Sequence, residues 1–142
     1  MSWGISIFKL PANLTSVRDL PKDFQIESLG SRASLISRIR ELFPDVDFPN
    51  ECWGSLVRPG YVIEFNMGES ETCDDFALRI VGGGDAMAAV AHLQQGLGLR
   101  GVDHQTGELF SESAAEDSFA EWQEFRDRAL AKFAPEPPNG PT

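Results

Sequence analysis

Cysteine and histidine are scarce in this sequence, with two residues of each type among 142. Two cysteines, Cys52 and Cys73, are too few for the disulfide scaffold of a small secreted protein and are typical of a reducing compartment. Together with His92 and His104 they also lack the close spacing of zinc motifs. We therefore expect no metal site and no cofactor, and we expect both thiols to stay reduced.

Long apolar runs are missing as well. The first residues do not combine a basic segment with an apolar one, as a secretory signal does, and no stretch approaches the ~20 apolar residues of a membrane span. The sequence thus predicts a cytoplasmic location and no membrane partner. Its composition, with 42% hydrophobic and 24% charged residues, is that of a globular protein.

Basic residues are few, with 12 Lys and Arg against 22 Asp and Glu, for a net charge of −10. Because a protein that binds nucleic acid neutralises phosphates with basic residues, we expect no nucleic-acid partner. Two interpretations of the acidity stay open: a surface that keeps the protein soluble, or a docking surface for a basic protein partner. Between residues 41 and 78 the one base is Arg58, and the acids are Glu41, Asp45, Asp47, Glu51, Glu64, Glu69, Glu71, Asp74 and Asp75.

Apolar periodicity predicts six strands and three helices. A turn at Pro59-Gly60 is expected to join two of the strands, with Gly60 supplying a positive φ, and Pro44 is expected to end the first helix. Glu64 and Arg79 are predicted to form a cross-strand ion pair. The predicted strands are residues 3–9, 53–57, 61–66, 76–80, 99–103 and 108–110, and the predicted helices are residues 31–43, 86–95 and 119–133.

This order of elements predicts an α+β protein, with a mainly antiparallel sheet and helices packed on one face. A ferredoxin-like arrangement with additions is one layout of this class. The chain is long enough for one domain, which we place at residues 1–133, followed by a disordered Pro-rich tail at residues 134–142. The last helix carries an apolar stripe that includes Trp122 and Phe125, and we expect it to pack against the sheet.

The glycine run Gly82-Gly83-Gly84 invites comparison with a phosphate-binding loop. It lacks the Gly-Lys-Ser/Thr of a P-loop, and Asp85 places a negative charge where a phosphate would bind. The run favours a tight turn from strand to helix, with Asp85 as the N-cap residue of the helix.

Asp103 and Glu108 bracket a tight turn and form a candidate acid–base pair. An Asp before a tight turn more often accepts hydrogen bonds from the amides of the turn, and we favour that structural role. No hydrolase, metalloprotease or deaminase motif is present. We therefore expect that the protein is not an enzyme and assign no catalytic residue.

Four segments resemble a family of short, uncharacterised bacterial proteins with an LRxxGGGD…DxQTGE pattern; they are Phe43–Phe48, Tyr61–Asn66, Leu78–Asp85 and Arg100–Glu108. This resemblance covers residues 43–110, implies a shared fold and specifies no reaction. In size and acidity the chain also resembles immunity proteins, which neutralise toxins delivered between competing bacteria. That second resemblance implies stoichiometric inhibition by occlusion of a toxin's active site.

The sequence therefore predicts an acidic cytosolic binding protein, an immunity protein against an intracellular bacterial toxin with a basic active site. The predicted contact residues are Glu69, Glu71, Asp74 and Asp75, with Asp45 and Asp47 as a second patch. The protein itself is expected to be a monomer or a homodimer. Two alternatives stay open: a structural or regulatory domain that assembles with itself through an exposed sheet edge, and a small enzyme with an unrecognised site.

Overall fold

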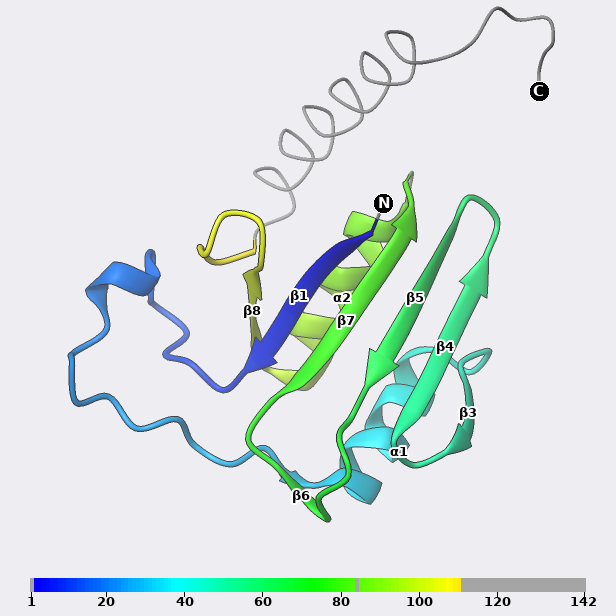
Figure 1. Cartoon of the computed structure of the whole chain (residues 1–142), viewed down its shortest axis with the longest axis horizontal. Helices are drawn as coiled ribbons and strands as arrows, with labels where there is room; N and C mark the ends of the chain where they lie inside the picture. Colours follow the sequence, from blue (N-terminus) through cyan, green and yellow to red (C-terminus); the bar gives the residue numbers. More distant parts are fainter. Residues whose placement is uncertain (1, 84, 111–142) are drawn as a thin grey trace, which may run out of the picture. The chain divides into compact units, whose positions relative to one another are not determined.

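A computed structural model describes residues 2–83 and 85–110 of the chain (Figure 1). These residues belong to one compact unit, Met1–Glu112, and a second unit is formed by Ser113–Thr142. The predicted last helix, with Trp122 and Phe125, and the predicted tail at residues 134–142 lie outside the described residues. The predicted domain boundary at residue 133 therefore stays a prediction.

One layer of the fold is an antiparallel sheet of six strands in the order β3-β4-β5-β7-β1-β8. A second sheet of two short strands, β2 and β6, forms an arm at one end (Figure 1). The strands are β1 (Trp3–Phe8), β2 (Gly30–Ser31), β3 (Asp47–Asn50), β4 (Trp53–Arg58), β5 (Tyr61–Asn66), β6 (Thr72–Cys73), β7 (Phe76–Gly82) and β8 (Arg100–Asp103).

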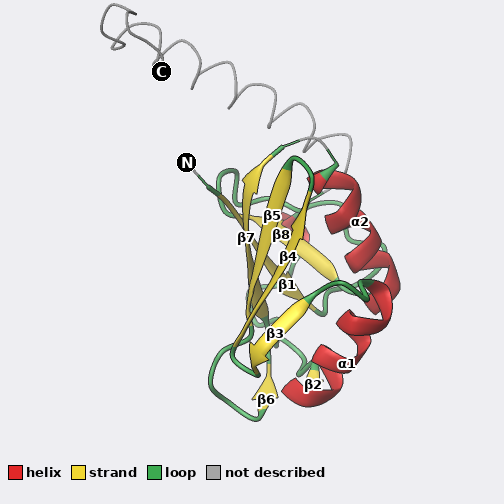
Figure 2. Ribbon diagram, turned by 90° about the vertical axis from the view of Figure 1, so that its right-hand side faces the viewer, coloured by secondary structure: helices red, strands yellow, loops and turns green. Residues whose placement is uncertain are grey.

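The second layer consists of the helices α1 (Arg32–Leu42) and α2 (Ala86–Leu97), which both lie on the same face of the sheet (Figure 2). A short 3₁₀ helix, Val17–Asp19, lies in the connection after β1. Helix α1 ends at Leu42, before Pro44, as predicted. This arrangement confirms the predicted α+β class with a mainly antiparallel sheet and helices on one face.

Alternate residues of the central strands build the core, because successive side chains of a strand point to opposite faces. On β5, Tyr61, Ile63 and Phe65 are buried, and the neighbouring strands β1 and β7 show the same alternation. The helices cover these side chains with their own apolar faces, which contribute Leu35, Ile36 and Ile39 from α1 and Met87, Val90, Leu93 and Leu97 from α2.

The opposite face of the sheet carries no helix of the described residues, and we call it the open face (Figure 2). Three cross-strand rows of residues run along it; they are Val57–Val62–Val81, Ser55–Glu64–Arg79–Gly4 and Trp53–Asn66–Ala77–Ser6. In the middle row, Nη1 of Arg79 lies 2.8 Å from Oε1 of Glu64, which confirms the predicted ion pair.

The structure differs from the predicted strands at three places. Thr72–Cys73, between the predicted strands at residues 61–66 and 76–80, is itself a strand and pairs with Gly30–Ser31. Residues 108–110 were expected to be a strand, yet only Leu109 forms a bridge, with Val102. Strand β3 was missed as well, because Pro49 and its polar neighbours do not show apolar alternation.

The succession β1-α1-β5-β7-α2-β8 has the β-α-β-β-α-β order of a ferredoxin-like unit. Strands β3 and β4, together with the β2–β6 arm, are additions to that succession. The ferredoxin-like assignment itself stays a prediction.

The turn from β7 to α2 depends on close backbone contact. Gly82 has a φ of 104°, and a Cβ at this position would meet the carbonyl oxygen of Gly60. Gly83 donates its amide to the same oxygen at 3.0 Å. Asp85 occupies the N-cap position of α2, but its carboxylate accepts no capping hydrogen bond, so the predicted capping role of that side chain was wrong.

We predict that Gly82→Ala lowers the free energy of unfolding by about 1–3 kcal/mol, because the new methyl group meets backbone in addition to the strain of a positive φ. Gly60→Ala is the matched control, since Gly60 has a φ of 90° with open space around its Cβ position. Urea unfolding of both variants measures the difference. Equal losses in the two variants would contradict the importance of the close contact.

Candidate functional site

The connection between β5 and β7, residues 67–75, carries the four acids that the sequence singled out, and we call it the acidic loop. Glu69, Glu71, Asp74 and Asp75 are all exposed. Within residues 2–83 and 85–110, none of these four carboxylates takes part in a hydrogen bond or an ion pair. The loop thus presents four unpaired negative charges.

Four other acids of the described part of the chain are paired with bases. Among them, Glu27 contacts Lys9 at 3.2 Å and Glu51 contacts Arg32 at 3.1 Å. Asp23, Glu41, Asp47 and Asp85 form no ion pair with the described residues either, so the density of its acids, four in seven residues, is what distinguishes the acidic loop.

The backbone of the acidic loop is held by the segment that precedes α1. The backbone carbonyl of Cys73 accepts a hydrogen bond from the amide of Leu29 at 2.7 Å, and the backbone carbonyl of Glu71 accepts one from the amide of Arg32 at 2.8 Å. The pairing of β2 with β6 adds the registers Gly30↔Cys73 and Ser31↔Thr72. Although its acidic side chains are exposed, the loop has a defined path.

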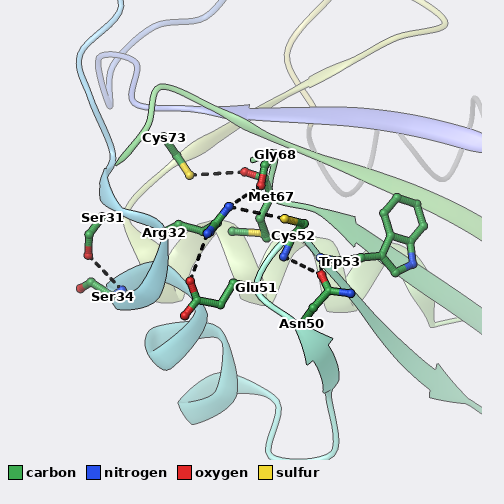
Figure 3. A network of polar contacts seen from close by, with 10 residues as sticks. All are labelled: Ser31, Arg32, Ser34, Asn50, Glu51, Cys52, Trp53, Met67, Gly68 and Cys73. Atoms are coloured by element: carbon green, nitrogen blue, oxygen red, sulfur yellow. Dashed lines mark hydrogen bonds and ion pairs between the residues drawn. The ribbon is translucent and has the colours of Figure 1, made fainter. Parts of the chain in front are cut away.

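Arg32 is the main side-chain anchor of the acidic loop (Figure 3). Its Nη1 donates to the carbonyl oxygen of Gly68 at 2.8 Å and lies 3.5 Å from Sγ of Cys52, and its Nη2 contacts Glu51. The Arg32 side chain is 12% exposed. Because hydrogen bonds from a charged donor are stronger than neutral ones, this guanidinium fixes the start of the loop against α1.

An open hollow of about 420 Å³ lies at the acidic loop and is lined by residues 66–70 and 72–77. Met67, Cys73 and Phe76 are buried and provide its apolar part. The thiol of Cys73 contacts the carbonyl oxygen of Met67 at 3.5 Å, and burial raises the pKa of this thiol. Polar and apolar residues thus line the same open hollow.

The second predicted patch differs from the first. Asp45 accepts two hydrogen bonds from Arg58, at 3.0 and 2.8 Å, and the guanidinium of Arg58 lies 5.3 Å from the ring centre of Phe43. The hydrogen bond from Arg58 holds the pKa of Asp45 below its ordinary value. Asp45 thus stabilises the connection after α1, at the end of β4 far from the acidic loop, and Asp47 lies exposed on the edge strand β3.

Sequence reasoning missed a close contact between Ser6 and His104, which are 98 positions apart. Ser6 Oγ lies 2.6 Å from Nε2 of His104, and the imidazole lies over Gly4, where a Cβ would be 2.5 Å from Nδ1. A serine nucleophile needs a base that a third group orients. No carboxylate of the described residues hydrogen-bonds Nδ1, so we assign this pair to fastening the turn after β8 onto β1.

Of the two carboxylates that bracket the turn, Asp103 accepts a hydrogen bond from within it and Glu108 accepts hydrogen bonds from outside it. Asp103 accepts the amide of Gln105 at 2.8 Å, which confirms the favoured structural role. Glu108 accepts the amide of Val17 at 2.7 Å and the hydroxyl of Ser16 at 2.8 Å. These hydrogen bonds, with the amide of Leu109, hold the pKa of Glu108 below its ordinary value.

The edges of the main sheet are poorly suited to pairing with another strand. On β3, Pro49 has no amide hydrogen to donate and the register with β4 is irregular. On the other edge, β8 has four residues, and Val102 already bridges to Leu109. The predicted self-assembly through a sheet edge finds little support in these strands and stays a prediction.

Comparison of the chain with family models, with curated proteins and with solved structures finds no match. No helix among residues 2–83 and 85–110 is long and apolar enough to cross a membrane. In the same part of the chain, no group of three or more His, Cys, Asp or Glu side chains is arranged to hold a metal ion.

We predict that Arg32→Met loosens the acidic loop, because the substitution keeps the apolar stem and removes the hydrogen bonds to Gly68 and Glu51. The cost should be about 1–3 kcal/mol for opening of the loop, and hydrogen exchange at the amides of Leu29 and Gly68 measures it. Arg38→Met is the matched control, since Arg38 lies on the same helix and donates to Leu97 instead. Exchange at these amides that is equally fast in both variants would contradict the anchoring role.

We predict that Glu108 contributes to acid sensitivity. Its pKa in the folded protein is below the ordinary value of 4.5, so its contribution to stability is present above that pH and is lost as the pH falls through the folded pKa. The free energy of unfolding of Glu108→Gln should therefore fall less steeply than that of wild type between about pH 5 and pH 3. Parallel curves for the two proteins would contradict this role.

Proposed function

We propose that this chain is an acidic binding protein that inhibits a basic protein partner, as an immunity protein inhibits an intracellular bacterial toxin by covering its active site. The observation that carries this proposal is the acidic loop, where four unpaired carboxylates lie on a backbone that is held at several points. The mechanism would be occlusion, and it assigns no chemistry to this chain.

Four carboxylates in seven residues repel one another and contribute nothing to folding. No Lys or Arg lies between Arg58 and Arg79 in the sequence, and the described residues supply no ion pair to the loop from elsewhere. A partner with clustered Lys and Arg would turn this repulsion into attraction and would be steered to the loop before contact.

The anchored backbone favours tight binding. A loop that must become ordered loses conformational entropy when it binds, which weakens the complex. Here Arg32 and the β2–β6 pairing hold the loop before any partner arrives. Toxins that cleave nucleic acids or handle nucleotides need basic clefts for phosphates. Carboxylates on a loop whose backbone is already held are suited to fill such a cleft in place of the substrate.

We predict that replacing Glu69, Glu71, Asp74 and Asp75 with Ser leaves stability nearly unchanged and slows association with the partner about tenfold or more at low salt. The loss should shrink at high salt, because screening already removes steering from wild type. The partner is first isolated from extracts of the native host with the wild-type chain and identified by mass spectrometry. Stopped-flow mixing then measures both association rates, and growth of cells that co-produce both proteins reports inhibition of toxicity.

A control variant with Asp19, Asp23, Glu41 and Asp85 replaced by Ser removes the same charge from exposed acids outside the acidic loop. It should keep an association rate within about twofold of wild type, since steering depends on charge near the interface. Equal rates for all three proteins at low salt would contradict the proposal and leave solubility as the role of the loop.

A further inference from the structure

The open face of the sheet gathers exposed apolar side chains. The described residues include four exposed large hydrophobic side chains, Ile26, Trp53, Val57 and Val81, and all except Ile26 lie on this face. Trp53 is 40% exposed and Val57 is 68% exposed. They lie on the same side of β4, four residues and roughly 13 Å apart, which is a span that one protein partner can cover.

Trp53 lies next to the acidic loop. It is opposite Asn66 on β5, which is opposite Ala77 on β7. Asn66 and Ala77 also line the open hollow at the acidic loop. Figure 3 shows the indole pointing away from the Arg32 network, and no ring or cation contact of the described residues involves it. Trp53, which makes no ring contact with the described residues, is thus the cross-strand neighbour of the residue that directly precedes the acidic loop.

A second copy of this chain is a poor occupant for the open face. When two identical faces pack together, the two-fold axis lies in the plane between them. An axis along the strands places Glu64 against Arg79 of the other copy, but it brings both acidic loops to the same end. An axis across the strands separates the loops, but it places Glu64 against Glu64 and Arg79 against Arg79. With the axis through the Glu64–Arg79 pair, each of these arrangements juxtaposes like charges, and a basic partner avoids both.

We propose that Trp53 is the anchor of the interface and receives an arginine side chain of the basic partner, whose remaining contacts extend over the open face toward Val57. The proposal rests on the proposed function and adds the chemistry of the partner. A guanidinium can stack on an indole while its edge donates to carboxylates, and here Trp53 pairs across the sheet with Asn66, the residue directly before the acidic loop. Lysine carries the same charge but lacks the planar group, so the site should discriminate between the two.

The test uses two defined probes of equal charge, a peptide of nine arginines and a peptide of nine lysines, at low salt. Wild type should bind the arginine peptide about two- to fivefold more tightly than the lysine peptide, in line with an exposed cation–π contact. Trp53→Leu should bind both peptides equally, and Trp53→Phe should keep part of the preference. Ile26→Leu is the control for an exposed apolar residue outside the open face and should keep the full preference.

The outcomes separate the two proposals. Equal affinity of wild type for both peptides, or an unchanged preference in Trp53→Leu, would overturn the role of Trp53. The variant with four serines in the acidic loop should bind both peptides weakly, and wild-type affinity in that variant would count against the proposed function instead. Light scattering completes the test, because a concentration-dependent dimer that Trp53→Leu abolishes would assign the open face to a second copy and overturn the proposal.

Discussion

The hydrogen bonds of Arg32 are the constraint on which the rest of the site depends. One guanidinium joins α1 to the carbonyl of Gly68, to Glu51 and to the sulfur of Cys52. The β2–β6 arm has two residues in each strand, and pairing that short is not stable in water by itself. Without this largely buried guanidinium, we expect the acidic loop to lose its main side-chain anchor and to depend on the backbone hydrogen bonds of the arm alone.

Some acids of this chain are paired with arginines, whereas the four carboxylates of the acidic loop form no ion pair with the described residues. Asp45, Glu51 and Glu64 are each paired with an arginine and hold parts of the fold together. The carboxylates of the acidic loop have no such pairs within the described residues. Trp53, on the open face, pairs across the sheet with Asn66, the residue directly before this loop. This combination of steering charge and apolar anchor is common where proteins bind proteins.

Sequence reasoning succeeded where the pattern is local and repeated. Strands β4, β5 and β7 alternate between buried and exposed residues, so their extent and their pairing through a tight turn could be predicted, as could the Glu64–Arg79 pair. It failed at β2 and β6, because each is too short to show a period and the two lie about forty positions apart in the chain. It also misplaced the role of Asp85, because an N-cap position does not guarantee that the side chain turns toward the helix.

The sequence by itself determined the charge, the class of fold and the density of acids in residues 69–75, since all three follow from composition and short-range pattern. Only the tertiary structure decided which acids are available to a partner. The carboxylate of Asp45 is paired because the side chain of Arg58, at the end of β4, reaches it. Ser6 contacts His104, which lies 98 positions later in the chain. Such contacts depend on how the sheet brings distant segments side by side, and no local pattern in the chain encodes that placement.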